Sequence, residues 1–152
     1  MSTGVLLVDK HAIIREGLRS LLEKQPDMTV LADTDEGAKA VELVRQLSPD
    51  VVVMDVTMTG LNGIEATRLI TAEFPQIKVI ALSIHSQRRF IAEVLSAGAA
   101  GYILKECLFE ELVEAIQAVA VGGRYLSPRI ANAAVGDRAN RLSTTADQPP
   151  VP

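Results

Sequence analysis

The sequence predicts an α/β fold, a doubly wound sheet of five parallel strands with helices on both faces, and two patterns carry this prediction. Short apolar runs alternate five times with longer stretches in which apolar residues recur at helical spacing. Some of the short runs are almost wholly apolar, as in Val51 to Met54, which is typical of strands covered on both faces. Five βα units with right-handed crossovers would bring functional groups to the carboxyl ends of the strands.

The five expected strands are short and lie within the first 104 residues. They are Val5–Asp9, Met28–Ala32, Val51–Asp55, Lys78–Ser83 and Gly101–Leu104.

Helical periodicity fills the intervals between these runs. An apolar stripe from Ile14 to Leu22 predicts a one-sided first helix, and a longer stripe from Phe109 to Ala120 predicts the last one. Asn62, three residues before Glu65, resembles a capping box that opens a helix running to Phe74. We expect Pro75 to end that helix and Gly122-Gly123 to end the last one.

The end of the chain has a different composition. Pro128 to Ala134 has the length of a short helix, and Arg138 to Pro152 is polar and rich in proline, as linkers are. We therefore expect one domain over residues 1–127, followed by a short helix and connecting tail over residues 128–152.

Composition restricts the class of protein. With 48% hydrophobic and 22% charged residues in a chain of 152, a folded domain is expected rather than a disordered chain. The single cysteine, Cys107, and the absence of zinc-type Cys/His spacing favour a reducing cytoplasm. No apolar run approaches the roughly 20 residues that span a bilayer, so no membrane partner is expected. A net charge of −4 argues against DNA binding by these residues.

Polar residues stand at four of the expected strand ends. Asp9, Asp55 and Ser83 close their strands and Lys105 directly follows the fifth. Strand ends are also simply where chains turn polar, but four such residues at one edge make a set that can act together. A nucleophilic aspartate, a hydroxyl and an ammonium are the groups that phosphoryl transfer to a carboxylate requires.

Four segments resemble the motifs of response-regulator receiver domains, which are CheY-like, in order and spacing. They are Val8-Asp9, Val53 to Met58, Ala81-Leu82-Ser83 and Gly101 to Lys105. His11 with Arg15 to Leu18, Gly63 to Ala66, and Gly122 to Pro128 are similar to the NarL/FixJ subfamily, whose members carry a LuxR-type output domain. The resemblance covers roughly residues 4 to 127.

The resemblance implies a role for each matching residue. Asp55 would be the phospho-acceptor, and Asp9 and the backbone carbonyl of Thr57 would join it in the acidic cluster that binds Mg²⁺. Ser83 and Lys105 would bind phosphoryl oxygens, and Tyr102 would be the aromatic side chain that rotates inward as Ser83 moves. His11 is expected to cap or pack the first helix rather than act in catalysis.

The resemblance also implies the fold order and the partners. The strand order would be 2-1-3-4-5, a sensor histidine kinase would supply the phosphoryl group, and a homodimer is one expected assembly. A LuxR-type DNA-binding domain is expected after residue 152, and DNA would be contacted only through it. The chain would be a phospho-acceptor rather than an enzyme, with at most slow self-phosphorylation and dephosphorylation.

Two positions depart from the family pattern. The acidic pair after the first strand appears here as Asp9-Lys10, so one metal-ligand acid is lost, and Thr59 replaces a proline. With Lys10 beside it, the cluster of Asp9, Asp55 and Lys105 has no net charge. A dication about 4 Å from an ammonium would meet a repulsion of about 8 kcal/mol at an effective dielectric constant near 20. Mg²⁺ at Asp9 and Asp55 should therefore bind weakly or not at all.

Two positions of the Lys10 side chain remain open, and with them two modes of action. The ammonium could take the place of the metal and pair with Asp55, which would make the chain a protein-interaction or dimerisation module that works without phosphorylation. Alternatively it could turn into solvent and leave a weakened metal site. A third function, a phosphatase of the haloacid-dehalogenase type, is disfavoured because Thr57 stands where such enzymes need an acid.

Overall fold

The computed structural model describes residues 2–57 and 62–130, and Thr59 and the tail from residue 131 lie outside this part. All strands of the sheet run parallel, in the order β2-β1-β3-β4-β5-β6. They are β1 (Thr3–Val8), β2 (Met28–Thr34), β3 (Val51–Asp55), β4 (Lys78–Ser83), β5 (Gly101–Leu104) and β6 (Tyr125–Leu126).

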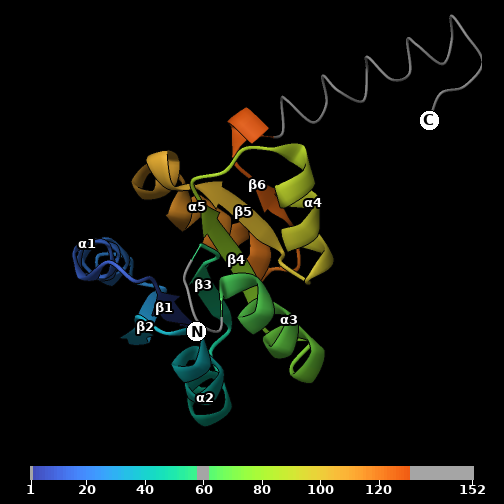
Figure 1. The fold of residues 1–152 in the computed structure, drawn as a ribbon. Helices are drawn as coiled ribbons and strands as arrows, with labels where there is room; N and C mark the ends of the chain where they lie inside the picture. The colour runs from blue at the N-terminus through green and yellow to red at the C-terminus, as the bar shows by residue number, and fades with distance from the viewer. Residues whose placement is uncertain (1, 58–61, 131–152) are drawn as a thin grey trace, which may run out of the picture.

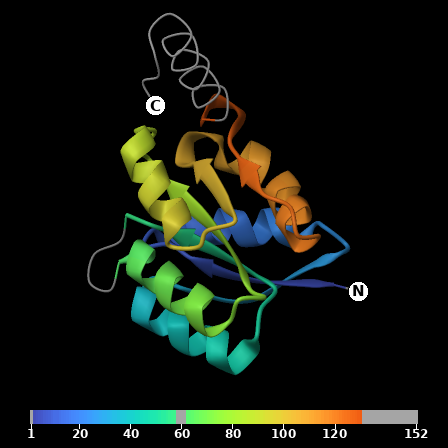
Figure 2. The same cartoon turned by 90° about the vertical axis from the view of Figure 1, so that its right-hand side faces the viewer.

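Helices cover both faces of the sheet (Figures 1 and 2). They are α1 (Ala12–Glu23), α2 (Gly37–Leu47), α3 (Gly63–Glu73), α4 (Arg88–Ser96) and α5 (Leu108–Ala120), with a 3₁₀ turn η1 (Lys105–Cys107) before α5. Helices α1 and α5 pack on one face, and α2, α3 and α4 pack on the other. The predicted doubly wound α/β fold is confirmed.

The core consists of two layers that meet at the sheet. Along β3, Val52 and Met54 face the layer under α2, α3 and α4, whereas Val51 and Val53 face α1 and α5. All five residues of β3 are buried, which is why its sequence is apolar without alternation and ends in a single buried acid. The central strands are therefore packed on both faces, and the residues at their carboxyl ends are held in place.

The predicted strand bounds hold for β3, β4 and β5 and are wrong elsewhere by one or two residues. Strand β1 ends at Val8, so Asp9 lies just beyond it, and β2 continues to Thr34 instead of ending at Ala32. The expectation of five strands is corrected by β6, which pairs with β5 through Gly101 and Tyr102. Two residues at a sheet edge are too short to give a periodic signal.

The glycines after α5 make the turn that leads into β6. Gly122 has φ +89°, a left-handed conformation that favours glycine. Its N–H bonds to the Val119 carbonyl and the N–H of Gly123 bonds to the Ala118 carbonyl, which is the Schellman arrangement. The predicted helix stop is therefore confirmed. Residues 128–130 are helical, and the rest of the expected short helix lies outside the described residues.

The start of α3 sits directly on the backbone after β3. The Asn62 side chain accepts a hydrogen bond from the Glu65 N–H at 2.9 Å, as the predicted cap requires, and Phe74 ends the helix. A Cβ at Gly63 would overlap the Asp55 carbonyl oxygen and the Val56 Cα, so only glycine permits this approach. None of the helices in the described ranges is both long and apolar enough to cross a membrane.

Candidate functional site

The four polar residues predicted at strand ends meet at one edge of the sheet. Asp9 follows β1, Asp55 ends β3, Ser83 ends β4 and Lys105 follows β5, and these strands are neighbours in the order β1-β3-β4-β5. Asp9, Asp55 and Ser83 are buried, and the Lys105 side chain is only 11% exposed. The parallel topology is what brings residues so distant in the chain together.

Lys105 joins the two carboxylates. Its Nζ lies 3.0 Å from Asp55 Oδ2 and 3.1 Å from Asp9 Oδ2. Two buried carboxylates on neighbouring strands would repel each other, and a shared ammonium offsets that repulsion. Lys105 is thus the cation at the centre of the cluster.

Thr57 holds the other oxygen of Asp55. Oδ1 accepts hydrogen bonds from the Thr57 N–H at 2.9 Å and from its hydroxyl at 2.6 Å. Burial opposes ionisation of Asp55, but the bonds from Thr57 and Lys105 outweigh it and hold the pKa of this carboxyl below its ordinary value. Asp55 is therefore an ionised, oriented carboxylate at neutral pH, the form that can attack phosphorus.

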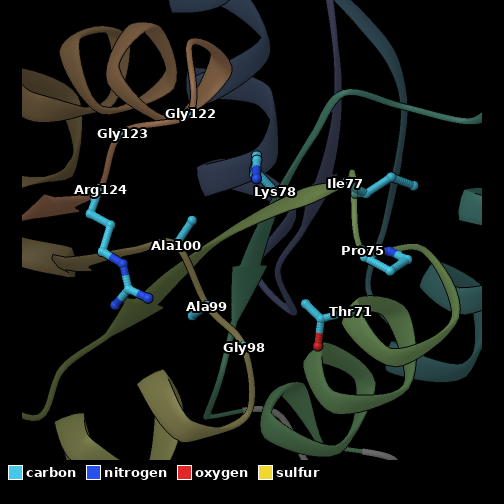
Figure 3. Close-up of a pocket in the computed structure, with 10 residues that line it drawn as sticks. All are labelled: Thr71, Pro75, Ile77, Lys78, Gly98, Ala99, Ala100, Gly122, Gly123 and Arg124. Carbon is cyan, nitrogen blue, oxygen red and sulfur yellow. The ribbon is translucent and has the colours of Figure 1, made fainter.

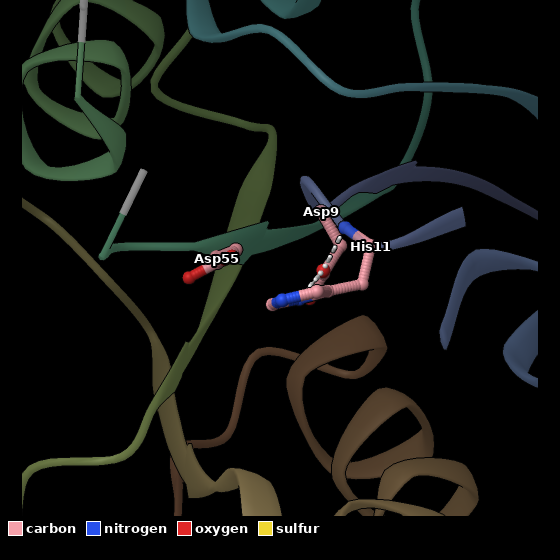
Figure 4. Close-up of side chains that lie close together, drawn as sticks. All are labelled: Asp9, His11 and Asp55. Atoms are coloured by element: carbon pink, nitrogen blue, oxygen red, sulfur yellow. Dashed lines mark hydrogen bonds and ion pairs between the residues drawn. The ribbon is translucent and has the colours of Figure 1, made fainter. Parts of the chain in front are cut away.

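Asp9 is fixed through three of its four polar atoms. Its N–H donates to the Thr34 carbonyl, its carbonyl accepts from Arg15 at 2.7 Å, and Oδ1 accepts from the His11 N–H at 2.8 Å. The His11 ring also lies near Oδ1, with Nδ1 at 3.2 Å (Figure 4). His11 is the N-cap residue of α1, but its side chain makes no cap hydrogen bond. The fourth atom, Oδ2, is left pointing to the cluster.

Lys10 lies outside the cluster in this structure. Its side chain is exposed and forms no ion pair with the described residues, and the Lys105 ammonium holds the position beside Asp55. The residues on either side of Lys10, Asp9 and His11, are tied by the hydrogen bonds that turn the chain into α1. The arrangement is the one in which Lys10 is turned into solvent.

Ser83 and Tyr102 both contact the segment after β4. The Ser83 hydroxyl accepts a hydrogen bond from the His85 N–H at 2.9 Å, and the Tyr102 hydroxyl donates to the His85 carbonyl at 2.7 Å. The Tyr102 side chain is fully buried, and this burial raises its pKa. Tyr102 therefore lies inward and is bonded to the same residue as Ser83.

The donor set suits a divalent cation of the magnesium type. Asp9, His11 and Asp55 each offer a ligand atom, all within 4.8 Å of one another (Figure 4). Asp9 Oδ2 is buried and makes no hydrogen bond within the described residues; the Lys105 ammonium is near it but badly angled. Carboxylate and carbonyl oxygens are what Mg²⁺ prefers, and it is usually held by one or two carboxylates. With Lys10 turned away, the cluster keeps one net negative charge, so the residues fit the ion.

Two residues near the site, Arg15 and Ser127, make hydrogen bonds that the sequence does not predict. Arg15 bonds both the Asp9 carbonyl and Asp33 of β2, and the predicted strand had ended before Asp33. Buried Ser127 donates to Glu111 at 2.7 Å and accepts from the Leu104 N–H at 3.1 Å, beside Lys105. Arg15 and Ser127 lie within the motifs that resemble the NarL/FixJ subfamily, but that resemblance implies no role for either residue.

A hollow lies beside the edge where the polar residues meet. A hollow of about 250 Å³ lined by Ile84, Leu104, Lys105 and Glu106 opens beside the Lys105 side chain. A second hollow, of about 260 Å³, lies at the opposite edge of the sheet, where Lys78 begins β4 and Gly98 to Ala100 precede β5 (Figure 3). It holds none of the four residues, so the carboxyl edge remains the candidate site.

Comparison with known families gives a match that covers most of the chain. The model of the response regulator receiver domain matches residues 5–117, which include all four residues at the strand ends. The matched region contains β2 to β5, and most of β1 and of α5.

Individual relatives agree with this match. The chain is 42% identical over 126 residues to the transcriptional regulatory protein DegU of Brevibacillus brevis, covering 83% of this chain and 53% of that protein. It is 42% identical over 127 residues to the response regulator GacA of Pseudomonas viridiflava, covering 84% of this chain and 59% of that protein. The chain therefore spans between half and two thirds of these relatives.

A solved structure agrees as well. A two-component response regulator of the LuxR family from Aurantimonas sp. SI85-9A1 superposes with a TM-score of 0.86 at 38% identity. The match covers 91% of this chain and 99% of that one.

Proposed function

The chain belongs to the response regulator receiver domain family, and from that premise we propose that it accepts a phosphoryl group on Asp55 from a sensor histidine kinase. Receiver domains are phospho-acceptors rather than classical enzymes. The observation that carries the proposal is the environment of Asp55, a buried and ionised carboxylate with Thr57 on one oxygen and Lys105 on the other.

The proposed step uses groups that already converge on Asp55. A carboxylate oxygen attacks phosphorus, the bond from phosphorus to the donor breaks, and the donor keeps the electron pair and takes a proton. The Lys105 ammonium, 3.0 Å from Oδ2, is close enough to pair with the transferred group, and Ser83 at the end of β4 can donate to one of its oxygens. The hollow beside Lys105 lies next to these groups.

Mg²⁺, held by Asp9, Asp55 and the backbone carbonyl of Thr57, would neutralise charge on the transferred group. The chain's own contribution is to keep Asp9 Oδ2 buried and aimed at that position. Because Lys10 replaces an acid, the site has one negative charge fewer than an acidic pair would give, and a weaker affinity for Mg²⁺ is expected.

The test is labelling with acetyl phosphate and Mg²⁺, followed by the intact mass of the protein. We expect the mass of one phosphoryl group on the chain and none on Asp55→Asn. Asp35→Asn, which removes an exposed acid outside the cluster, is the matched control and should label like the parent. An unlabelled parent at saturating Mg²⁺, or equal labelling of Asp55→Asn, would refute phosphorylation at Asp55.

A second candidate function is a receiver that acts without phosphorylation, as a protein-interaction or dimerisation module. It is favoured by the replacement of an acid by Lys10, which weakens the expected Mg²⁺ site, and it is compatible with Tyr102, which is buried and bonded to the His85 carbonyl. The two candidates differ in one measurement. If the association state in analytical ultracentrifugation does not change when Asp55 is labelled, the second function is supported.

The rest of the proposal concerns the longer protein. Residues 1–127 would form the receiver, and the segment from residue 128 would connect it to a LuxR-type output domain that binds DNA. A cytoplasmic location and control of transcription are proposed from the family. The buried Ser127, bonded to both Leu104 and Glu111, supports a fixed exit for the chain beside the site.

A further inference from the structure

Arg15 links the site to the far edge of the sheet. It begins the second turn of α1, and its guanidinium donates from Nε to Asp33 Oδ1 at 3.0 Å and from NH1 to the Asp9 carbonyl at 2.7 Å. The side chain is only 19% exposed, and Asp33 lies on β2, the edge strand next to β1. One planar group with fixed donors thus ties the residue after β1 to a neighbouring strand.

Asp33 is itself held in place from a second side. Arg19, one helical turn after Arg15, donates to Asp33 Oδ2 at 2.7 Å. The bonds from Arg19 and Arg15 outweigh partial burial and keep the pKa of Asp33 below its ordinary value. Asp33 is therefore ionised at neutral pH and gives Arg15 a fixed anchor, whereas Arg19 touches Asp33 but makes no contact with Asp9.

The bond from Arg15 to the Asp9 carbonyl restricts rotation of the backbone between Asp9 and α1. With the Asp9 carbonyl bound by Arg15 and its carboxylate bound by the His11 N–H, the backbone on both sides of Lys10 is fixed. The Lys10 side chain is exposed in this arrangement. Without the Arg15 bond the segment could rotate, and the cluster, which has one net negative charge, would attract the Lys10 ammonium.

We propose that Arg15, anchored by Asp33, is a positioning residue that aims Asp9 Oδ2 into the site and keeps the Lys10 ammonium out of the metal position. This inference rests on the proposed phospho-acceptor function, because it concerns the Mg²⁺ site of that function. With Lys10 in place of an acid, the metal position can bind Mg²⁺ only while the Lys10 ammonium is kept away from it, and Arg15 is the residue that does so.

The first test measures the position of Lys10 and needs neither metal nor phosphoryl group. The lysines are reductively methylated with formaldehyde and their rates are followed by peptide mass spectrometry, with exposed Lys24 as the internal reference. In Arg15→Met the Lys10 rate should fall about fivefold, because an ammonium held mostly in an ion pair is withheld from the reagent. Arg19→Met, which breaks a similar bond to Asp33, should leave the rate unchanged.

The second test measures Mg²⁺ affinity by calorimetry. Arg15→Met should weaken it about tenfold, because the released Lys10 ammonium then competes with the ion for the same position. Arg19→Met should change it by less than about twofold, because Arg19 bonds Asp33 and not Asp9. Adding Lys10→Ala to Arg15→Met should restore most of the affinity, which a merely structural defect would not allow.

The outcomes separate this inference from the proposed function. Equal losses in Arg15→Met and Arg19→Met, an unchanged Lys10 rate, or a loss that Lys10→Ala does not restore would each overturn the positioning role. If Arg15→Met does not fold, Asp33→Asn is the alternative variant. It removes the charge that holds Arg15 and should also lower the methylation rate of Lys10. A Lys10 rate that falls as expected in a chain that acetyl phosphate never labels would keep the positioning role and refute the proposed function.

Discussion

The two sides of the site hold their acids in different ways. On the phosphoryl side, formed by Asp55, Thr57, Ser83 and Lys105, the strand ends supply the groups themselves, and Asp55 is bonded by side chains that belong to the site. On the acidic side, formed by Asp9, Lys10 and His11, the carboxylate is aimed by the backbone of a turn and by Arg15, which lies outside the site.

This difference explains where the chain can depart from its family. Ser83 and Asp55 are fully buried, so a change of charge there would leave an unpaired charge in the core. Lys10 lies on the turn of the acidic side and is exposed, so the loss of an acid there leaves the fold intact and changes only the electrostatics. The acidic side can therefore vary its affinity for a cation while the phosphoryl side stays constant.

The largest expected effect comes from Lys105, the residue that joins the two sides. Lys105→Met leaves the carboxylates of Asp9 and Asp55 facing each other without a cation, and should lower the free energy of unfolding at pH 7 by about 3 kcal/mol. Mg²⁺ should recover part of the loss, because the cluster then has two negative charges. Urea unfolding followed by circular dichroism measures both effects.

Lys24→Met is the control for Lys105→Met, because Lys24 is an exposed lysine outside the cluster and its loss should have almost no effect. A loss below about 1 kcal/mol in Lys105→Met would mean that the two sides are not coupled through this ammonium.

A smaller effect is expected at Lys10, where an acid can be restored. Lys10→Asp changes the charge beside the cluster by two units and should tighten Mg²⁺ binding by at least about tenfold, at little cost in stability. Lys24→Asp makes the same change of charge elsewhere and should alter the affinity much less. Calorimetric titration of both variants decides. Equal gains in the two would show that net charge, and not the acidic side, limits the ion.

The phosphoryl side can be tested by removing the Thr57 hydroxyl and measuring how stability depends on pH. Because the pKa of Asp55 is lowered in the folded chain, its ionisation stabilises the fold above the ordinary value of 3.8 and ceases to do so as pH falls through the folded value. Thr57→Val removes one of the bonds that lower this pKa and keeps the N–H bond. It should cost about 1 kcal/mol at pH 7.

The difference between Thr57→Val and the parent should be constant well above the ordinary pKa of 3.8 and should shrink as pH falls through the lowered pKa of folded Asp55. Unfolding curves across this range measure it. A difference that does not depend on pH would mean that the hydroxyl acts by packing and not by its bond to Asp55.

The sequence predicted most of the fold because its central strands are sharply bounded apolar runs. Val51–Asp55, Lys78–Ser83 and Gly101–Leu104 were placed to the residue, and burial on both faces is the reason that their limits are so clear. Strand β2 was placed too short because Asp33 and Thr34 are polar, and their places in the strand depend on contacts with α1 and β1. Such contacts between distant residues leave no periodic pattern.

The convergence of Asp9, Asp55, Ser83 and Lys105 was predictable because parallel topology places strand ends together. The direction of the Lys10 side chain was not predictable, because the sequence is compatible with both positions. That direction depends on the bonds that tie Asp9 to His11 and Arg15, and these become visible only once α1 lies against β2. Strand periodicity predicts which residues share an edge, but not how side chains from several elements orient one of them.

The smallest expected effect is at the His11 ring, and it shows how the acidic side works. The ring is 52% exposed and its Nδ1 makes a 3.2 Å hydrogen bond to Asp9 Oδ1, whereas the backbone N–H of the same residue makes the shorter bond at 2.8 Å. His11→Ala keeps that N–H, so stability should change by no more than about 0.5 kcal/mol and Mg²⁺ affinity by less than about threefold. Calorimetry at pH 7.5, with Arg15→Met measured alongside, compares the two supports of Asp9. A larger loss for His11→Ala than for Arg15→Met would make the imidazole, not the guanidinium, the group that orients Asp9.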